Sequence, residues 1–314
     1  MIGECMLELS ASNDGAGMSK EMTLSYGGDT LNTAIYLSRL GLQVNYITAL
    51  GDDDYSDWMI EQWKMEGVCC EQVMQLANNL PGLYMIKTDD VGERQFSYWR
   101  SDSPARKLFN DEKQCQLLFK QLIAYDWIYL SGITLSLFSS PVRIQFFEFL
   151  SDFRTLGGKV AFDSNYRALG WPSITEAQRD ISTMNQHTDI ALSTLEDELL
   201  LFGDSDEYAV ITRLHRLGVT EVAIKMGADG CLVSENNRKL LVKSQHVENI
   251  IDTTAAGDSF NGAYLAQRIN KVFAVAAAEY GHRLAAKVIQ FHGAIIPQNV
   301  MVDMLISRPI KICE

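Results

Sequence analysis

The sequence predicts an α/β protein with a mostly parallel sheet that is covered by helices on both faces. Short β-branched or aromatic runs alternate with segments of helical periodicity along most of the 314 residues, and such alternation is typical of parallel sheets. Four of the helical segments are followed by a glycine, the usual helix terminator. The length suits one large domain of this class, so we expect a single domain over residues 1–314.

This fold class rests on six predicted strands and six predicted helices. The strands are predicted over 2–9, 44–50, 127–131, 159–163, 189–192 and 221–225. Four helices are predicted over 29–40, 55–66, 141–156 and 208–217, ending at Gly41, Gly67, Gly157 and Gly218. Two more are predicted over 259–269 and 281–291. Ligands of such sheets bind at the carboxyl ends of the strands, so functional residues are expected there.

One segment departs from the alternation. The runs 83–88 (LYMIKT) and 93–100 (ERQFSYWR) are strand-like, and Asp89-Asp90-Val91-Gly92 joins them. Two such runs joined by a short polar loop predict a β-hairpin. The hairpin is either a lid that stands off the main sheet or an ordinary surface hairpin, and the residues alone favour neither.

Composition restricts the class of function. The formal charge of −13 argues against a nucleic-acid or anionic-membrane partner, because binding such surfaces requires a basic protein. The six cysteines form no CxxC pair and the five histidines no HExxH pattern, so reduced thiols and no zinc site are expected. The start, MIGECMLELS, has no basic region, and no apolar run approaches a membrane span. We therefore expect a soluble, cytoplasmic protein.

The segment DTTAAGDSF, residues 252–260, places small residues and a carboxylate at a predicted helix start. Free amides and the helix dipole form an anion site there, and small side chains let a phosphate approach the backbone. Asp258 could accept the proton of an attacking hydroxyl. The amides of Ala255, Ala256 and Gly257 would then stabilise charge on the transferred group. Taken alone, the segment is explained better by an aspartate that merely caps a helix.

Three segments together resemble the signatures of the PfkB/ribokinase family of sugar kinases. DTTAAGD resembles the family's D-T-x-G-A-G-D, and GGDTLNTA at 27–34 with LG at 40–41 resembles its GGxxxNxA…LG. KMGADG at 225–230 is similar to the K-x-G-x-x-G segment of the family's nucleotide site. Each motif is weak, but all three occur in order over nearly the whole chain. The resemblance implies a ribokinase-like three-layer fold with a small β-sheet lid, formed mainly by about 80–103 with part of 8–28.

The same resemblance assigns residues to ligands. The catalytic groups would be Asp258, Arg167 and the amides of Ala255, Ala256 and Gly257. The sugar would contact Gly27, Gly28, Asn32, Tyr84, Tyr98, Arg100, Arg167 and Asp258. ATP would contact Asn165, Thr194, Lys225, Gly227, Ala228, Asp229, Gly230, Ala255, Gly257 and Ala286. Mg²⁺ would be held mainly by ATP and water near Asp197, without direct side-chain ligation, and a monovalent cation is left open.

Arginines at the sugar end favour an acidic substrate. Arginine binds a carboxylate through a planar, two-pronged contact, for which a neutral sugar has little use. The stretches GECMLELS, GGDTLNTA, LPGLYMIKT, YWR and FDSNYR are similar to those of the family's 2-keto-3-deoxygluconate kinases. This implies ATP-dependent phosphorylation of that sugar acid at its terminal hydroxyl. The alternative explanations are a solvated charge for Arg100 and a structural ion pair for Arg167.

Several other functions are less well supported by the sequence. A fructokinase or another PfkB-type kinase for a neutral sugar is the nearest alternative, and the arginines count against it. No GxGxxG follows the first strand and no GxxxxGK[ST] occurs, which disfavours a dinucleotide-dependent oxidoreductase and a P-loop kinase. A non-catalytic sugar or nucleotide sensor is disfavoured by the intact Asp258. The family's habit also favours a homodimer or higher homo-oligomer through the lid.

The sequence departs from the family pattern at three places. Ala255 replaces the first glycine of G-A-G-D, and alanine is strained at positive φ, so we expect an allowed backbone conformation there with the methyl group facing the phosphates. TLED at 194–197 stands where the family often has N-x-x-E, so a threonine and a shorter acid would order metal-bound water. The chain begins almost inside its first strand, whose edge is therefore in doubt.

Overall fold

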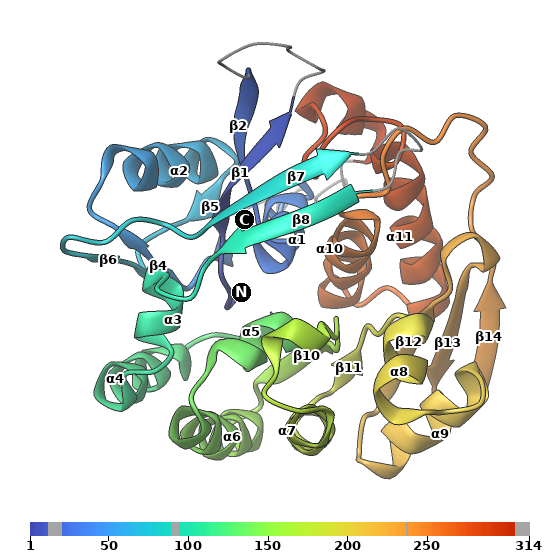
Figure 1. Ribbon diagram of the computed structural model, residues 1–314. Helices are drawn as coiled ribbons and strands as arrows, with labels where there is room; N and C mark the ends of the chain where they lie inside the picture. The colour runs from blue at the N-terminus through green and yellow to red at the C-terminus, as the bar shows by residue number, and fades with distance from the viewer. Residues whose placement is uncertain (12–20, 89–93, 237, 305–314) are drawn as a thin grey trace, which may run out of the picture.

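The central sheet of the computed structural model has six strands in the order β14-β13-β12-β11-β10-β9 (Figure 1). The structure describes residues 1–11, 21–88, 94–236 and 238–304. The strands are β9 (Trp127–Ser131), β10 (Lys159–Asp163), β11 (Ile190–Ala191), β12 (Glu221–Lys225), β13 (Cys231–Glu235) and β14 (Arg238–Val242). Strands β9 to β12 run parallel, and β13 and β14 extend the sheet antiparallel. The predicted mostly parallel sheet is confirmed.

Helices cover both faces of this sheet, which gives three layers. Tyr129 and Ala161 pack with α1 (Asp29–Arg39), α10 (Ala256–Ile269) and α11 (Ala274–Val288) on one face. Ile128, Leu130, Val160 and Phe162 contact the helices of the other face. The remaining helices are α2 (Asp54–Met65), α3 (Pro104–Leu108), α4 (Glu112–Leu122), α5 (Gly132–Leu137), α6 (Ser140–Thr155), α7 (Ile174–Gln186), α8 (Leu195–Phe202) and α9 (Glu207–Arg216). The four predicted stop glycines all have positive φ, as helix terminators require.

A second sheet, which we call the small sheet, stands apart from the central one (Figure 1). Its order is β2-β1-β7-β8, with β1 at Met6–Ala11, β2 at Met22–Gly27, β7 at Leu83–Thr88 and β8 at Arg94–Trp99. Strands β7 and β8 form the predicted hairpin, with Tyr84 opposite Tyr98. The joining loop 89–92 lies outside the described residues. Strand β1 lies between the hairpin and β2.

Two of the predicted strands are wrong in extent. The range 2–9 is divided between the sheets, because Ile2 donates its amide to the Tyr129 carbonyl at 2.9 Å whereas Met6 begins β1. The range 44–50 is divided into β3 (Val44–Asn45) and β4 (Thr48–Gly51), which pair with β5 (Val68–Cys69) and β6 (Val73–Leu76). A chain that passes from one sheet to another keeps its alternating pattern, so the pattern alone does not show where it crosses.

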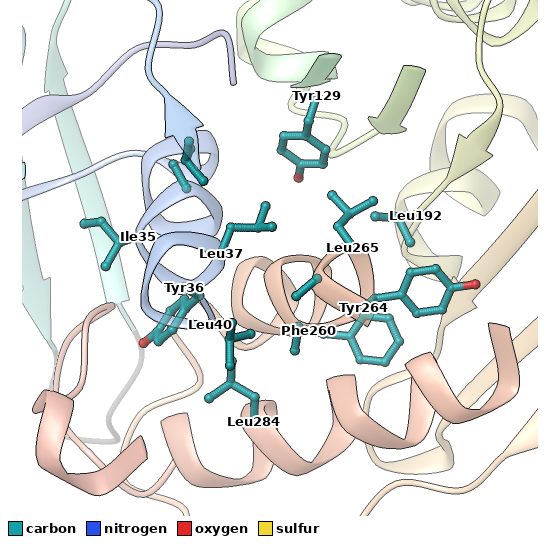
Figure 2. Packing of buried hydrophobic residues seen from close by; sticks show 14 of the residues in the cluster. Ile35, Tyr36, Leu37, Leu40, Tyr129, Leu192, Phe260, Tyr264, Leu265 and Leu284 are labelled. Atoms are coloured by element: carbon teal, nitrogen blue, oxygen red, sulfur yellow. The ribbon is translucent and has the colours of Figure 1, made fainter. Parts of the chain in front are cut away.

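The helix predicted over 281–291 is also wrong at both ends, since α11 spans Ala274–Val288. Gly281 lies inside this helix, where glycine is otherwise unfavourable. A methyl group on Gly281 would stand 2.7 Å from the ring of Phe260. Figure 2 shows Phe260 and Leu284 in the core that α10 and α11 share with Tyr36 of α1. Close packing of α10 on α11 therefore explains the glycine.

We expect Gly281→Ala to lower the free energy of unfolding by about 1–2 kcal/mol, because overpacking against the Phe260 ring outweighs the gain in helix propensity. Urea unfolding monitored by circular dichroism would measure the change. Glu279→Ala introduces the same residue at an exposed position of the same helix and should be nearly neutral. Equal stability of the two variants would contradict this account of the helix contact.

Candidate active site

A solvent-open cleft of about 410 Å³ lies between the carboxyl ends of the central strands and the small sheet. Ile133, Asp163 and Thr194 come from the central sheet side, and Tyr84, Phe96 and Tyr98 come from the small sheet. The predicted residues that line this cleft are Gly27, Gly28, Asn32, Tyr84, Tyr98, Arg100, Asn165, Arg167, Thr194, Lys225, Ala255, Ala256, Gly257 and Asp258. Residues far apart in the sequence are therefore brought together around one space.

The predicted conformation of Ala255 is wrong. This residue precedes α10 with φ 59° and ψ 15°, in the left-handed region, which costs a non-glycine residue about 1–2 kcal/mol. The turn before it is held by Asp252, whose carboxylate accepts from the amides of Thr254 and Gly293, each at 2.8 Å. Ser259 closes the first helical turn by donating to the Ala255 carbonyl at 2.8 Å. These contacts on both sides hold the alanine in the strained conformation.

The start of α10 has the properties of an anion site. The amide of Ala256 donates to the Thr253 carbonyl at 3.2 Å and is thereby partly occupied. For the amides of Ala255 and Gly257, no backbone acceptor is found among the described residues. Small side chains on these residues leave the backbone accessible from the cleft, and the helix dipole adds positive potential. The arrangement suits a phosphate group.

Asp258 follows directly and is held from α1. Its Oδ2 accepts from Asn32 Nδ2 at 2.8 Å, and its carbonyl accepts from Thr33 Oγ1 at 3.2 Å. Burial raises the pKa of Asp258 to about 7, and the charges of Asp29 and Asp163 add to this effect, whereas Asn32 and Lys225 oppose it. A carboxyl group with such a pKa can take up and release a proton near neutral pH.

Lys225 lies beneath this helix start within a buried polar network. Its Nζ donates to Asp163 Oδ2 at 2.8 Å and to Asn261 Oδ1 at 3.1 Å. Asn261 in turn donates to Asp163 at 2.7 Å and to the Tyr129 hydroxyl at 3.0 Å. A methyl group on Gly257 would stand 3.5 Å from Lys225 Nζ. The lysine thus places a positive charge directly under the anion site.

Asp29 and Asn165 complete the central side of the cleft. Asn165 has φ 28°, and its side chain donates to Asp29 Oδ2 at 2.7 Å. Its amide donates to Asp163 Oδ1 at 3.1 Å. Burial raises the pKa of Asp29, and the charge of Asp163 raises it further. Asp29 is part of the GGDTLNTA motif, but its closeness to Asp258 was not foreseen.

Arg167 reaches the cleft while paired with Asp197. Its Nη1 donates to the Asp197 carboxylate at 3.0 and 3.2 Å and to the Tyr166 carbonyl at 2.7 Å. Burial raises the pKa of Asp197, and the charge of Arg167 opposes that shift. Within the described ranges, no group of three or more His, Cys, Asp or Glu residues could hold a metal ion. The prediction that Mg²⁺ is held mainly by ATP and water near Asp197 stays a prediction.

Two glutamates that were not predicted hold the side chains of the opposite wall in place. Glu4 accepts hydrogen bonds from Arg100 and Ser103, and Glu8 accepts from the Tyr84 hydroxyl and, at 3.0 Å, from Ser25. The Tyr84 and Tyr98 rings lie 5.9 Å apart, and the Phe96 ring stacks on Tyr98. The sequence signal that could have revealed these glutamates is their spacing. Glu4 and Glu8 lie four residues apart in the otherwise mostly apolar stretch GECMLELS.

The other predicted nucleotide residues do not line the cleft. Gly227, Ala228 and Asp229 form the short helix η2 (Gly227–Asp229) at the end of β12, adjacent to Lys225. Gly230 has φ 106°, and a methyl group there would stand 2.2 Å from the Val242 carbonyl. Ala286 is buried in α11. Their contacts with a nucleotide remain predictions.

A helix start that suits phosphate, together with a carboxylate able to accept a proton, is an arrangement typical of phosphoryl-transfer enzymes. A sequence profile described as "pfkB family carbohydrate kinase" matches residues 1–300, and the chain belongs to this family. Among the helices that the structure describes, none is long and apolar enough to cross a membrane.

Known proteins of three kinds are similar to the chain. A 2-dehydro-3-deoxygluconokinase of Dickeya dadantii is 45% identical over 96% of this chain and 97% of its own length. A fructokinase of Vibrio alginolyticus is 29% identical over 76% of this chain and 75% of its own. The structure of a putative ribokinase II from E. coli, in complex with ATP and Mg²⁺, has a TM-score of 0.80 and 25% identity, covering 93% of this chain and 92% of that one. The ribokinase-like fold is thereby confirmed.

We expect the Asp258 carboxyl group to titrate near pH 7, because burial and the charge of Asp29 disfavour its ionised form. Carbon-13 NMR of protein labelled at the aspartate carboxyls would measure the pKa, and the resonance missing from Asp258→Asn would assign it. Asp29→Asn should lower the pKa of Asp258, since a repelling charge is removed. Titration near the ordinary aspartate pKa in the unaltered protein would contradict the predicted environment.

Proposed function

We propose that the protein transfers the γ-phosphoryl group of ATP to the terminal hydroxyl of 2-dehydro-3-deoxygluconate (2-keto-3-deoxygluconate), giving the 6-phosphate and ADP. The observation that carries the proposal is the arrangement of one cleft: Asp258 and the start of α10 on one side, and Arg100 on the other. A phosphoryl group suits the first side and a carboxylate suits the second. The high identity to a 2-dehydro-3-deoxygluconokinase supports the choice of sugar acid.

Asp258 acts as the base in this proposal. The substrate hydroxyl lies between its carboxylate and the phosphate, so that the proton passes to Asp258 as the new phosphorus–oxygen bond forms and the bond to ADP breaks. Asn32 holds the carboxylate in place through its 2.8 Å hydrogen bond. Because the ionised form is required, activity should fall as the pH drops below the pKa of about 7.

The charge that develops on the transferred group is met by fixed donors. The amides of Ala255 and Gly257 face it from the helix start, together with the amide of Ala256, which is shared with the Thr253 carbonyl. Lys225 adds an ammonium whose third N–H is not used by Asp163 or Asn261. Arg167 offsets phosphate charge from the side of Asp197. Mg²⁺, when bound with ATP, would screen the phosphates. Such positioning and electrostatic stabilisation supply most of the catalysis in phosphoryl transfer.

The sugar is expected to lie against Gly27, Gly28, Tyr84 and Tyr98. A methyl group on Gly27 would stand 2.2 Å from the Tyr84 hydroxyl, so glycine is needed for this approach. The small sheet would act as a lid that excludes water, which otherwise competes as the acceptor of the phosphoryl group.

We also propose that this single-domain protein forms a homodimer through the small sheet. We propose further that it acts in the cytoplasm, where ATP is supplied. The exposed side chains of Leu24 and Trp99 on that sheet support an interface. The mass of the protein in solution at micromolar concentration, measured by sedimentation, would decide the oligomeric state.

Release of ADP from Mg-ATP across a panel of sugars and sugar acids tests the proposed function. We expect 2-dehydro-3-deoxygluconate to be the preferred acceptor, whereas a preference for fructose would favour the fructokinase alternative. Arg100→Ala should raise the KM for the sugar acid by roughly 10- to 100-fold, the value of a charged hydrogen bond, and barely change that for a neutral sugar. An equal effect on both substrates would argue against a carboxylate contact.

Asp258→Asn should lower kcat by roughly 10²- to 10⁴-fold, because an amide cannot accept the proton. Binding of ATP, measured by calorimetry, should remain close to that of the unaltered protein, since the helix-start amides are unchanged. Asp303→Asn serves as the control, because it makes the same change at an exposed carboxylate that is distant from Asp258 in the sequence. A variant at position 258 with near-normal turnover would exclude Asp258 as the base.

A further inference from the structure

The cation that faces the sugar end of the cleft is already neutralised. The Glu4 side chain is only 2% exposed, and it accepts hydrogen bonds from both Arg100 and Ser103. Arg100 and Glu4 together carry no net charge. A carboxylate that approaches this pair would be attracted by the guanidinium and repelled by the glutamate at similar distances. Arg100 alone therefore does not explain how the cleft would bind an acid.

A second guanidinium lies beside this pair. Arg106 belongs to α3, and its amide donates at 3.4 Å to the Oγ of Ser103, the same hydroxyl that donates to Glu4. Burial and the charge of Arg100 lower the pKa of Arg106, while Glu4 acts in the opposite direction. Arg106, Arg100 and Glu4 are thus close enough for their charges to interact.

Arg106 is only partly buried, but one donor of its guanidinium group lacks a partner within the part of the chain that the structure describes. Its Nε is buried, and among the described residues no hydrogen-bond acceptor lies within reach. The Nε of Arg100 is likewise buried and has no hydrogen-bond partner among the described residues. Buried donors are normally paired because leaving them unpaired is costly. Two guanidinium groups and one carboxylate leave one net positive charge in this cluster. A net positive charge close to the cleft favours an anionic ligand there.

We propose that Arg106 supplies the uncompensated positive charge that makes the Arg100–Glu4 end of the cleft selective for a substrate carboxylate. Glu4 holds Arg100 in position, and Arg106 restores the net charge that Glu4 removes. Arg106 does not line the cleft, so it acts as a positioning and specificity-determining residue behind Arg100. The inference rests on the proposed function, in which the substrate is a sugar acid. A neutral sugar would leave the charge unpaired and is thereby disfavoured.

Steady-state kinetics of Arg106→Gln test the proposal. The KM for 2-dehydro-3-deoxygluconate should rise by roughly 5- to 10-fold with kcat little changed, because the lost charge is partly screened and acts on binding and not on phosphoryl transfer. Arg106→Lys retains the charge and should keep the KM within about twofold. Lys107→Gln removes an exposed charge from the same helix, one paired with Asp102, and should leave both constants unchanged.

Calorimetry separates this inference from the proposed function. Gluconate and its neutral counterpart glucitol would be titrated into the unaltered protein and into Arg106→Gln. Preferential binding of gluconate that is lost in Arg106→Gln would support the inference even if no sugar acid were phosphorylated. An unchanged KM in a folded Arg106→Gln, or equal discrimination between the two probes in both proteins, would overturn it. A failure of the unaltered protein to phosphorylate any sugar acid would overturn the proposed function alone.

Discussion

The buried ion pair between Lys225 and Asp163 is the contact on which the cleft depends. It joins the carboxyl ends of β12 and β10, and Asn261 ties both groups to α10. Two buried charges are costly to desolvate unless they are paired and hydrogen-bonded, and here Lys225, Asp163 and Asn261 are hydrogen-bonded to one another. Loss of either partner would leave an uncompensated charge directly beneath the start of α10. The position of the anion site therefore follows from this network.

Charge is distributed unequally along the cleft. Asp29, Asp163 and Asp258 gather near the helix start, where Lys225 is the cation that partly offsets them. Their mutual repulsion and burial raise the pKa of Asp258 and so adapt it to proton transfer near neutral pH. At the small-sheet end the balance is reversed, with Arg100 and Arg106 against Glu4. In the proposed function these two ends have different roles, proton acceptance at the helix start and binding of a carboxylate at the small sheet, in a protein with a formal charge of −13.

Ala255 shows that local strain is tolerated where the surroundings determine the backbone. Its left-handed conformation is unfavourable for alanine, yet the turn before it is anchored by Asp252 and the helix after it begins at once. Strained residues of this kind persist when the neighbouring contacts outweigh the cost, and they gather at functional sites. The alanine therefore does not abolish the helix-start amides that the motif predicted.

Patterns among near neighbours were sufficient to predict the parallel sheet, the stop glycines and the hairpin at 83–100, whereas the cleft residues at 27–32 and 255–258 followed from the resemblance to the family's motifs. Helix and strand periodicity, together with glycine conformation, depend on residues a few positions apart, and the sequence displays them directly. The pairing of Asn32 with Asp258, separated by 226 positions, and that of Arg100 with Glu4, separated by 96, arise only when the sheets assemble. The same holds for the Nε of Arg106, unpaired within the described ranges, for the conformation of Ala255 and for the true extent of α11. Each of these depends on packing between distant segments, which local patterns do not encode.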